Sequence, residues 1–333
     1  MKRDVVWGEH LRWQPAPESA GLRVGIIGAG KMARLHLQTL RAMPGVEVAG
    51  IHSRSNVSGE QLAREFKIER YYHDRQQLLT EARLDAVLIA VSIEASYAIT
   101  AQTLAARVPC LIEKPAALTA AETAQLAALA AAHDCANMVA VNRRFYSIVT
   151  QGLLAVMQFG PVRGVLVEAH EPLQDYRGRR QFTSQVYDNW LAANTIHAID
   201  LLRMIGGQVA SVQTIKNSFN EPGGDSFSAN VRFANGIIGT LVMHWNSARG
   251  FGLKIYGNGV TAELWPLEEG FLRFDNGRRI KLQPDWADTQ FKPGLYAQNA
   301  AFLQAVQDQT QAALPASDLR DQVKTMELIE QIF

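Results

Sequence analysis

A lysine at the end of a short apolar run is the first residue of this sequence that is suited to chemistry. The run at 109–113 reads as a buried strand, and Lys114 and Pro115 follow it directly. Proline restricts the preceding residue to extended backbone, which fixes the direction of the Lys114 side chain. An amine held in this way can move a proton to or from a substrate oxygen when burial or a cationic neighbour such as Arg143 lowers its pKa. We interpret Lys114 as a general acid or base, with a plain surface lysine as the alternative.

A glycine-rich stretch near the start of the chain is suited to binding phosphate groups. An apolar run, Leu22–Ile27, is followed by Gly28-Ala-Gly30-Lys-Met-Ala33 and then by a helical pattern of leucines. Gly28 permits a tight turn, Gly30 lets the backbone approach a pyrophosphate, and Ala33 is small enough for helix to pack on strand. Lys31 and Met32 lie in the first helical turn, whose free N–H groups attract an anion. The stretch predicts dinucleotide binding.

The residues after the second predicted strand, Val46–His52, bear on which dinucleotide is bound. An acidic side chain there would bind a ribose 2′-hydroxyl and repel a 2′-phosphate, but the sequence reads Ser53-Arg54-Ser55. Arg54 is suited to pair with a 2′-phosphate and to stack on adenine, and the serine hydroxyls add donors. The sequence therefore favours NADP(H), with NAD(H) as the second choice and a solvated surface arginine as the alternative interpretation.

A frame of alternating strands and helices is needed to position these residues. Further apolar runs at 85–91 and 138–142 predict strands, and helical patterns lie near 31–43, 59–66, 75–82, 95–106 and 119–133. The last of these opens with a capping box, Thr119-Ala-Ala-Glu122. The alternation predicts a doubly wound parallel sheet, a Rossmann domain over 21–142. Residues 1–20 show no periodicity and are interpreted as an N-terminal extension.

The pattern changes after Asn142, where a second domain over 143–333 is expected. Helices are predicted at 148–157 and 191–205, a strand at 162–170, and a polar, turn-rich stretch at 171–180. Farther on, residues 227, 229, 231 and 233 alternate as in a half-buried strand, and Asn-Gly pairs at 235, 258 and 276 predict hairpins. We expect an α/β domain with a largely antiparallel, open-faced sheet, covered on one face by the two helices. Val242 and Trp245 are expected on the other face. Two amphipathic helices, near 295–308 and 318–333, end the chain, and the last is expected to pack back on the first domain.

Composition argues against several classes of protein. The 33 Lys and Arg nearly balance the 32 Asp and Glu, which gives no basic surface for nucleic acid or anionic membranes. Cys110 and Cys135 show no metal or redox spacing, so no metal site is predicted. The N-terminus lacks the apolar core of a signal peptide, and no apolar run approaches the ~18 residues of a membrane span. We expect a cytoplasmic location.

Taken together, these motifs resemble those of the glucose–fructose oxidoreductase, inositol dehydrogenase and rhizopine-catabolism family (Gfo/Idh/MocA). The resemblance runs from Leu22 onward and rests on Gly28 to Ala33, Asp85-Ala-Val-Leu-Ile-Ala90, Glu113-Lys114-Pro115, Asn142-Arg-Arg-Phe145 and His197-Ala-Ile-Asp200. It implies an NAD(P)-dependent dehydrogenase or reductase acting on CH–OH groups of a sugar, cyclitol or related polyol. It also implies that Lys114 is catalytic, that His197 is a second acid/base or substrate-binding group, and that Glu113 and Asn142 join the cofactor-binding residues.

The resemblance further suggests where substrate and partner subunits bind. The nicotinamide would lie between the two domains, with Lys114 and His197 on the substrate side. The predicted substrate contacts are Arg143, Tyr146, Tyr176, Arg177, Trp190, Asn194 and His197, and packing at the domain junction is the alternative role for them. In the family the open sheet face is buried against another subunit, which implies a homodimer or homotetramer.

Two positions depart from the family pattern. Ala193 stands where the family often has an aspartate four residues before the histidine, and the stretch from Ser92 to Ser96 replaces Pro-x-x-x-His. Lys114 would then act with less help, or Asp188 or Asn194 would fill part of the gap. The missing aspartate favours the alternative of a non-catalytic NAD(P)-binding regulatory protein, since the family includes a transcriptional corepressor. The intact Glu113-Lys114-Pro115 argues against it.

Overall fold

The computed structural model describes residues 21–180 and 182–333, and these fall into two compact units. One unit holds the described residues up to Asn142 together with Gln290–Met326. The other holds Arg143–Thr289 together with Glu327–Phe333. The predicted N-terminal extension lies outside the described residues. No helix in the described part of the chain is long and apolar enough to cross a membrane.

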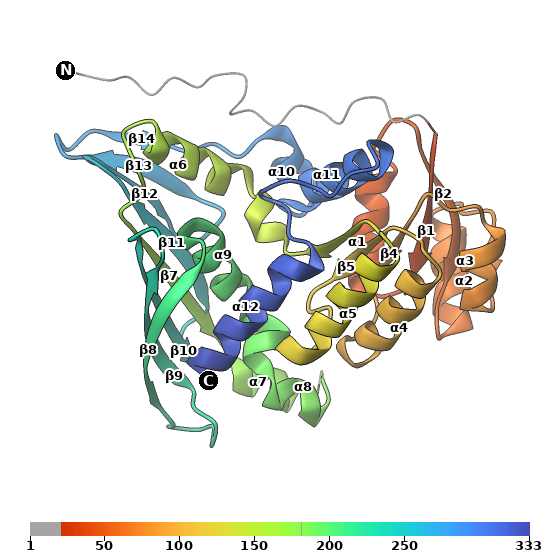
Figure 1. The fold of residues 1–333 in the computed structure, drawn as a ribbon, viewed down its shortest axis with the longest axis horizontal. Coiled ribbons are helices and arrows are strands. Elements are labelled where there is room, and N and C mark those ends of the chain that lie inside the picture. Colours follow the sequence, from red (N-terminus) through yellow and green to blue (C-terminus); the bar gives the residue numbers. More distant parts are fainter. Residues whose placement is uncertain (1–20, 181) are drawn as a thin grey trace. The chain divides into compact units, whose positions relative to one another are not determined.

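A parallel sheet forms the centre of the first unit (Figure 1). Its six strands among the described residues follow the order β3-β2-β1-β4-β5-β6, which is the Rossmann order, and confirm the predicted doubly wound sheet. The strands are β1 (Leu22–Ile27), β2 (Val46–His52), β3 (Tyr71–Tyr72), β4 (Ala86–Ile89), β5 (Cys110–Glu113) and β6 (Asn137–Ala140). The helices are α1 (Lys31–Leu40), α2 (Asn56–Glu65), α3 (Arg75–Glu81), α4 (Ile93–Ala105), α5 (Ala120–Ala132) and α11 (Leu295–Gln307). Residues of α12 (Leu319–Ile332) up to Met326 also belong to this unit.

Local signals in the sequence account for where these helices begin. The Thr119 hydroxyl accepts a hydrogen bond from the Glu122 N–H at 3.1 Å, so the predicted capping box does cap α5. The Glu122 carboxylate accepts one from the Leu118 N–H. Asp74 caps α3 in the same way through the Gln76 N–H. β4 and β6 are buried along their whole length, and β4 accordingly reads as a continuous apolar run, as does β6 after its first residue, Asn137.

The second unit contains a mostly antiparallel sheet (Figure 1). Its eight strands within the described residues follow the order β14-β13-β12-β11-β7-β10-β9-β8, and only the β7–β10 pair among them is parallel. The strands are β7 (Gly164–Glu171), β8 (Val209–Asn217), β9 (Ser226–Phe233), β10 (Ile238–Trp245), β11 (Gly250–Tyr256), β12 (Val260–Leu264), β13 (Gly270–Phe274) and β14 (Arg279–Lys281). Each predicted Asn-Gly pair lies between two paired strands, and the glycine of each pair has a positive φ.

Helices cover one face of this sheet. They are α6 (Ser147–Met157), which packs on β11 to β13, and α9 (Ile196–Gly206), which packs on β7 and β10. The remaining helical segments are η2 (Asn142–Phe145), α7 (Leu173–Gly178), α8 (Ser184–Asp188), the π-helical η3 (Leu191–Thr195) and α10 (Trp286–Gln290). The sequence predicted one continuous helix over 191–205 and a turn-rich stretch at 171–180, where the structure has η3 before α9 and has α7.

The open face of the sheet differs from the expectation in one residue. Val242 lies on the open face, but Trp245 is buried on the covered side. Side chains alternate along a strand, so two residues three apart cannot share a face, and the placement of Trp245 on the open face was wrong. The open face carries Trp265, which lies against Gly250 and Gly252, and charged residues such as Glu168 and Lys254.

A buried ion pair ties η2 to α9. The Arg144 guanidinium donates two hydrogen bonds of 2.6 Å to the Asp200 carboxylate, and both side chains are at most 1% exposed. A bidentate pair in this setting offsets the cost of burying both charges only while both partners are present. The pair joins the second arginine of the Arg-Arg motif to the aspartate that ends the His-x-x-Asp motif.

We expect Asp200→Leu to lower the free energy of unfolding by about 3–5 kcal/mol, because it leaves the Arg144 charge buried without its carboxylate. Urea denaturation followed by tryptophan fluorescence measures this loss. The double variant Arg144→Met/Asp200→Leu should be more stable than Asp200→Leu, since no charge is left uncompensated. Equal stability of the single variant and the wild type would contradict the interpretation.

Candidate active site

The predicted cofactor-binding residues lie at one edge of the parallel sheet. The strands β1, β2, β5 and β6 run parallel, so their carboxyl ends meet at that edge. Gly28 follows β1, Ser53 follows β2, and Glu113 is the last residue of β5. Ligands of open α/β sheets bind outside this edge, where the strand order reverses between β1 and β4. The structure therefore brings the first-unit residues of the prediction to the edge that suits a dinucleotide.

The glycine turn fits a pyrophosphate. Gly28 has a φ of +118°, and a Cβ there would lie 2.1 Å from the carbonyl oxygen of Ala90. A Cβ on Gly30 would meet no atom within 4 Å, which leaves open space at the start of α1. No side chain of the described residues caps α1, so its first N–H groups and its dipole are available to an anion. Lys31 and Met32 lie in this turn, and Ala33 is fully buried against the sheet.

The segment after β2 presents a single cation. Arg54 and Ser55 are exposed, whereas Ser53 is buried. The Ser55 hydroxyl accepts the Ser58 N–H at 3.3 Å and so caps α2. The backbone oxygen of Ser53 accepts a hydrogen bond from Tyr71. Arg54 is therefore the side chain of this segment that is suited to reach a ligand, while Ser55 also has a structural role.

Glu113 is engaged in a buried polar chain rather than facing open space. Its carboxylate lies 2.8 Å from Nε2 of His36, and Nδ1 of His36 lies 2.9 Å from the amide oxygen of Asn299 on α11. Burial acts to raise the pKa of Glu113, but the hydrogen bond and charge of His36 and the charges of Lys292 and Lys114 outweigh it, so the pKa is lowered. The residue before Lys114 thus remains ionised and anchors β5 to α1 and α11.

Lys114 follows Glu113 and is half-buried. Its charge acts on Glu113, as does that of Lys292, whose Nζ lies 3.8 Å from Sδ of Met32. Asn142, another predicted residue, is buried and donates to the backbone oxygen of Pro293 at 2.8 Å. Two ammonium groups are therefore placed around the carboxylate at the end of β5.

In the second unit, predicted substrate contacts gather around a buried carboxylate, Glu171, at the end of β7. Glu171 is 2% exposed and accepts hydrogen bonds from Nε1 of Trp190 at 2.8 Å, from Oγ1 of Thr195 at 2.9 Å and from the Asn194 amide. Burial raises the pKa of Glu171, against the opposing effect of these bonds and of the Arg143 charge. Sequence reasoning did not select Glu171 or Thr195.

Arg143 lies close enough to this carboxylate for their charges to interact, and Tyr146 is hydrogen-bonded to Arg143. The Arg143 guanidinium sits 3.6 Å from the ring centre of Phe251, and burial lowers its pKa against the charges of Tyr146, Glu171 and Glu268. Its Nη1 is buried and has no hydrogen-bond partner among the described residues. Burial raises the pKa of Tyr146 to about 12, although Arg143 opposes the rise. Arg143 thus has one donor left for a ligand oxygen, and Tyr146 is a neutral hydroxyl.

The remaining predicted contacts are Tyr176, Arg177 and His197. The Tyr176 ring packs on Trp190 with centres 5.3 Å apart, and its hydroxyl accepts a hydrogen bond from Arg249. Arg177 forms an ion pair of 2.9 Å with Glu221 and lies over Tyr187, so its charge is already paired. His197 is buried as the second residue of α9. A substrate contact by any of these residues stays a prediction.

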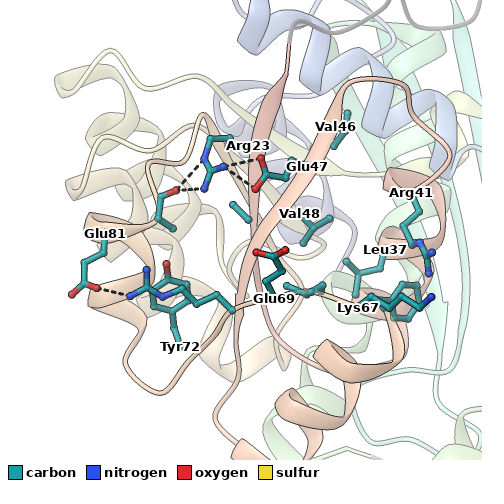
Figure 2. A pocket seen from close by; sticks show the side chains of 15 residues that line it. Arg23, Leu37, Arg41, Val46, Glu47, Val48, Lys67, Glu69, Tyr72 and Glu81 are labelled. Carbon is teal, nitrogen blue, oxygen red and sulfur yellow. Dashed lines mark hydrogen bonds and ion pairs between the residues drawn. The ribbon is translucent and has the colours of Figure 1, made fainter.

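A separate cavity of about 500 Å³ opens at the amino ends of β1 and β2 (Figure 2). Four of its charged side chains pair with each other, Arg23 with Glu47 and Arg70 with Glu81. It lies at the sheet edge opposite to Gly28, so it does not belong to the dinucleotide site.

Residues that the sequence did not select come from distant segments. His36 reads as part of a helix, and Lys292 comes from a segment about 180 residues after Lys114. Only the folded unit places Lys292 beside Met32 and Glu113. For Glu171, a signal was present: an acidic residue ends a strand that otherwise alternates.

Comparison with known proteins shows the family to which the chain belongs. The model described as "Oxidoreductase family, NAD-binding Rossmann fold" matches residues 22–141, and that of the "GFO/IDH/MocA C-terminal domain" matches residues 151–263. The two matches define an oxidoreductase with a Rossmann domain that binds NAD(P). The chain belongs to the GFO/IDH/MocA family, which confirms the resemblance seen in its motifs.

Individual relatives are distant. The inositol 2-dehydrogenase of Acidothermus cellulolyticus is 24% identical over 273 residues, which cover 80% of this chain and 79% of that protein. An oxidoreductase from Agrobacterium radiobacter, solved in complex with NAD+, L-tartaric acid and magnesium, has a TM-score of 0.79 at 19% identity and covers 94% of this chain and 95% of its own. The UDP-N-acetylglucosamine 3-dehydrogenase GnnA from Acidithiobacillus ferrooxidans has a TM-score of 0.76 at 21% identity, with 93% and 96% covered. These solved structures show the fold.

The two glycines provide a matched test of the nucleotide site. We expect Gly28→Ala to destabilise the protein by about 1–3 kcal/mol, because it adds a Cβ in a left-handed conformation against the Ala90 carbonyl. Gly30→Ala should change stability by less than about 1 kcal/mol, since its Cβ meets no atom, yet it should weaken NADPH and NADH binding. Urea denaturation and fluorescence titration measure the two effects. Unchanged nucleotide binding by Gly30→Ala would contradict the assignment of this turn.

Proposed function

We propose that this protein is an NAD(P)-dependent dehydrogenase or reductase that acts on a carbinol or carbonyl carbon of a sugar, cyclitol or related polyol. The observation that carries the proposal is the position of Lys114. It directly follows β5, at the same sheet edge as the glycine turn after β1. This position supports the proposal, because an amine suited to proton transfer follows a strand at the edge where open α/β sheets bind dinucleotides.

The division of roles follows from the chemistry of each group. A bound nicotinamide supplies hydride donation or acceptance. Lys114 would move the proton at the substrate oxygen, and Glu113, held ionised by His36, fixes the strand end that carries it. In the second unit, His197 would be the second acid/base or hydrogen-bonding group. Arg143 and Tyr146 would donate to substrate oxygens, for which Nη1 of Arg143 has capacity left.

The substrate class rests on the relatives and on the polarity of the groups around Glu171. The names of the relatives specify inositol and UDP-N-acetylglucosamine as substrates of those proteins. Arg143, Tyr146 and Asn194 are hydrogen-bonding side chains beside aromatic rings, a combination that suits a hydroxyl-rich ring compound. A polyol or sugar fits this set better than an apolar alcohol does.

We also propose that the open face of the eight-stranded sheet is covered by a second copy of the chain, in a homodimer or homotetramer. Ile238, Tyr256 and Trp265 are exposed there, with 58%, 36% and 51% of their surfaces accessible. Around them lie paired charges, such as Arg273 with Glu263 at 2.8 Å. A mixed apolar and charged surface of this kind is typical of contacts between subunits.

Replacing Lys114 tests the catalytic role. We expect Lys114→Ala to lower turnover by about 10²–10⁴-fold with any sugar or polyol that the wild type reduces or oxidises. NADPH affinity should change little, and Lys114→Arg should not restore turnover, because a guanidinium does not give up its proton. NADPH oxidation is followed at its absorbance band with a panel of keto sugars and aldoses. Retained activity in Lys114→Ala would remove the lysine from the mechanism, and absence of activity in the wild type across the panel would favour the regulatory alternative.

Arg54 decides the proposed preference for NADP(H). We expect the wild type to bind NADPH more tightly than NADH, and Arg54→Ala to weaken NADPH binding by about 10- to 100-fold, the equivalent of one charge-assisted hydrogen bond. NADH binding should change little, because NADH carries no 2′-phosphate. Quenching of tryptophan fluorescence measures both affinities. A wild-type preference for NADH would remove this role from Arg54 while leaving the dehydrogenase proposal in place.

A further inference from the structure

The buried carboxylate of Glu171 accepts hydrogen bonds from the segment that precedes His197. The three side-chain donors to Glu171 are Trp190, Asn194 and Thr195, and all of them come from the six residues at 190–195. The next residue, Ile196, begins α9, and His197 follows it. The backbone of Glu171 is fixed as well, since its carbonyl oxygen accepts the Asn246 N–H at 2.7 Å. The carboxylate thus connects the end of β7 to the start of the histidine helix.

The held segment has an unusual conformation. Leu191–Thr195 forms a π-helical turn, which is rare and tends to occur at functional sites. A wider turn than an α-helix is locally unfavourable, so contacts outside the turn must stabilise it. Asn194 and Thr195 are the last two residues of the turn, and their hydrogen bonds to Glu171 provide this stabilisation. Asp200, farther along α9, is held separately by Arg144, so the bonds to Glu171 act on the segment just before His197.

The carboxylate is also near His197 along the chain, because it accepts a hydrogen bond from Thr195, which lies two residues before the histidine. Ala192 and Ala193, in the turn itself, supply no charge. Arg143 and Tyr146 from η2, and Glu268 from the loop after β12, are the other charged or titratable groups around this carboxylate. Within this cluster, Glu171 is the carboxylate that bonds directly to the segment carrying His197.

We propose that Glu171 is a positioning residue for His197: its carboxylate fixes the π-helical turn and supplies the negative charge that sets the protonation of the imidazole. The proposal rests on the acid–base role proposed for His197. It assigns to a strand-end glutamate a task that the alanine at position 193 cannot perform.

The titration of His197 itself tests this without a known substrate. The full-length chain, labelled with ¹⁵N in its 8 histidines, is titrated by NMR, and the His197 signal is identified by its loss in His197→Gln. In Glu171→Gln we expect the titration midpoint of His197 to fall by about 0.5 unit or more, because a nearby negative charge that favours the imidazolium is lost. A His197 midpoint equal to that of the wild type would overturn the proposal.

Glu168→Gln is the matched control. It removes the same charge from the same strand, but on the open face of the sheet, where Glu168 lies 3.8 Å from Nε2 of His170. This variant should shift the titration of His170 and leave His197 unchanged. An equal shift of His197 in both variants would mean that the general charge of the unit matters, and would overturn the specific role of Glu171.

A second pair of variants separates positioning from folding. Thr195→Val removes one donor to Glu171 at nearly constant volume, whereas Thr195→Ser keeps the hydroxyl. We expect Thr195→Val to move the His197 signal and Thr195→Ser to leave it near the wild-type position. This pair decides the question if Glu171→Gln does not fold, and an unmoved His197 signal in Thr195→Val would overturn the proposal. NADPH titration of the same samples tests the proposed function separately, since the nucleotide site lies in the other unit.

Discussion

Compensation of buried charge is the constraint on which this structure depends. Three carboxylates, those of Glu113, Glu171 and Asp200, are withdrawn from water, and each is held by donors from another element. A buried carboxylate without partners would cost several kcal/mol. The partners of these carboxylates must therefore be in place when each unit is folded. Glu113 and Asp200 both belong to motifs by which the sequence resembles its family.

The same constraint links stability to function at the end of β5. Glu113 is needed to tie β5 to α1 and α11 through His36 and Asn299. Because it stays ionised, it also sets the electrostatic surroundings of Lys114 and Lys292. A residue that the sequence suggested as a cofactor contact is thus bound to the protein itself. The glutamate of the Glu-Lys-Pro motif stabilises the strand end, and the proposed proton transfer is assigned to the lysine that follows it.

The fold was largely predictable because its signals are local. Alternating strands and helices, the capping box at Thr119 and the three Asn-Gly turns each act within a few residues, and the structure confirms all of them. The error at Trp245 arose from ignoring the two-residue period of a strand. The charge partners were not predictable, since His36 and Lys292 approach the Glu113 carboxylate only after folding. Arg177 shows the same limit, because its pairing with Glu221 joins segments 44 residues apart.

In the segment before α9, hydrogen bonds to a residue distant in the sequence override the local preference for an α-helix. The apolar spacing of 191–205 predicts one regular helix, and regular hydrogen bonding would favour it. The structure instead has a π-helical turn over Leu191–Thr195, with its polar side chains directed to Glu171. Satisfying a buried carboxylate outweighs the preference of five residues for the α-helix. Departures from regular geometry of this kind are stabilised by the surrounding structure. The departure ends two residues before His197, so the same buried carboxylate that distorts the helix also constrains the backbone next to this histidine.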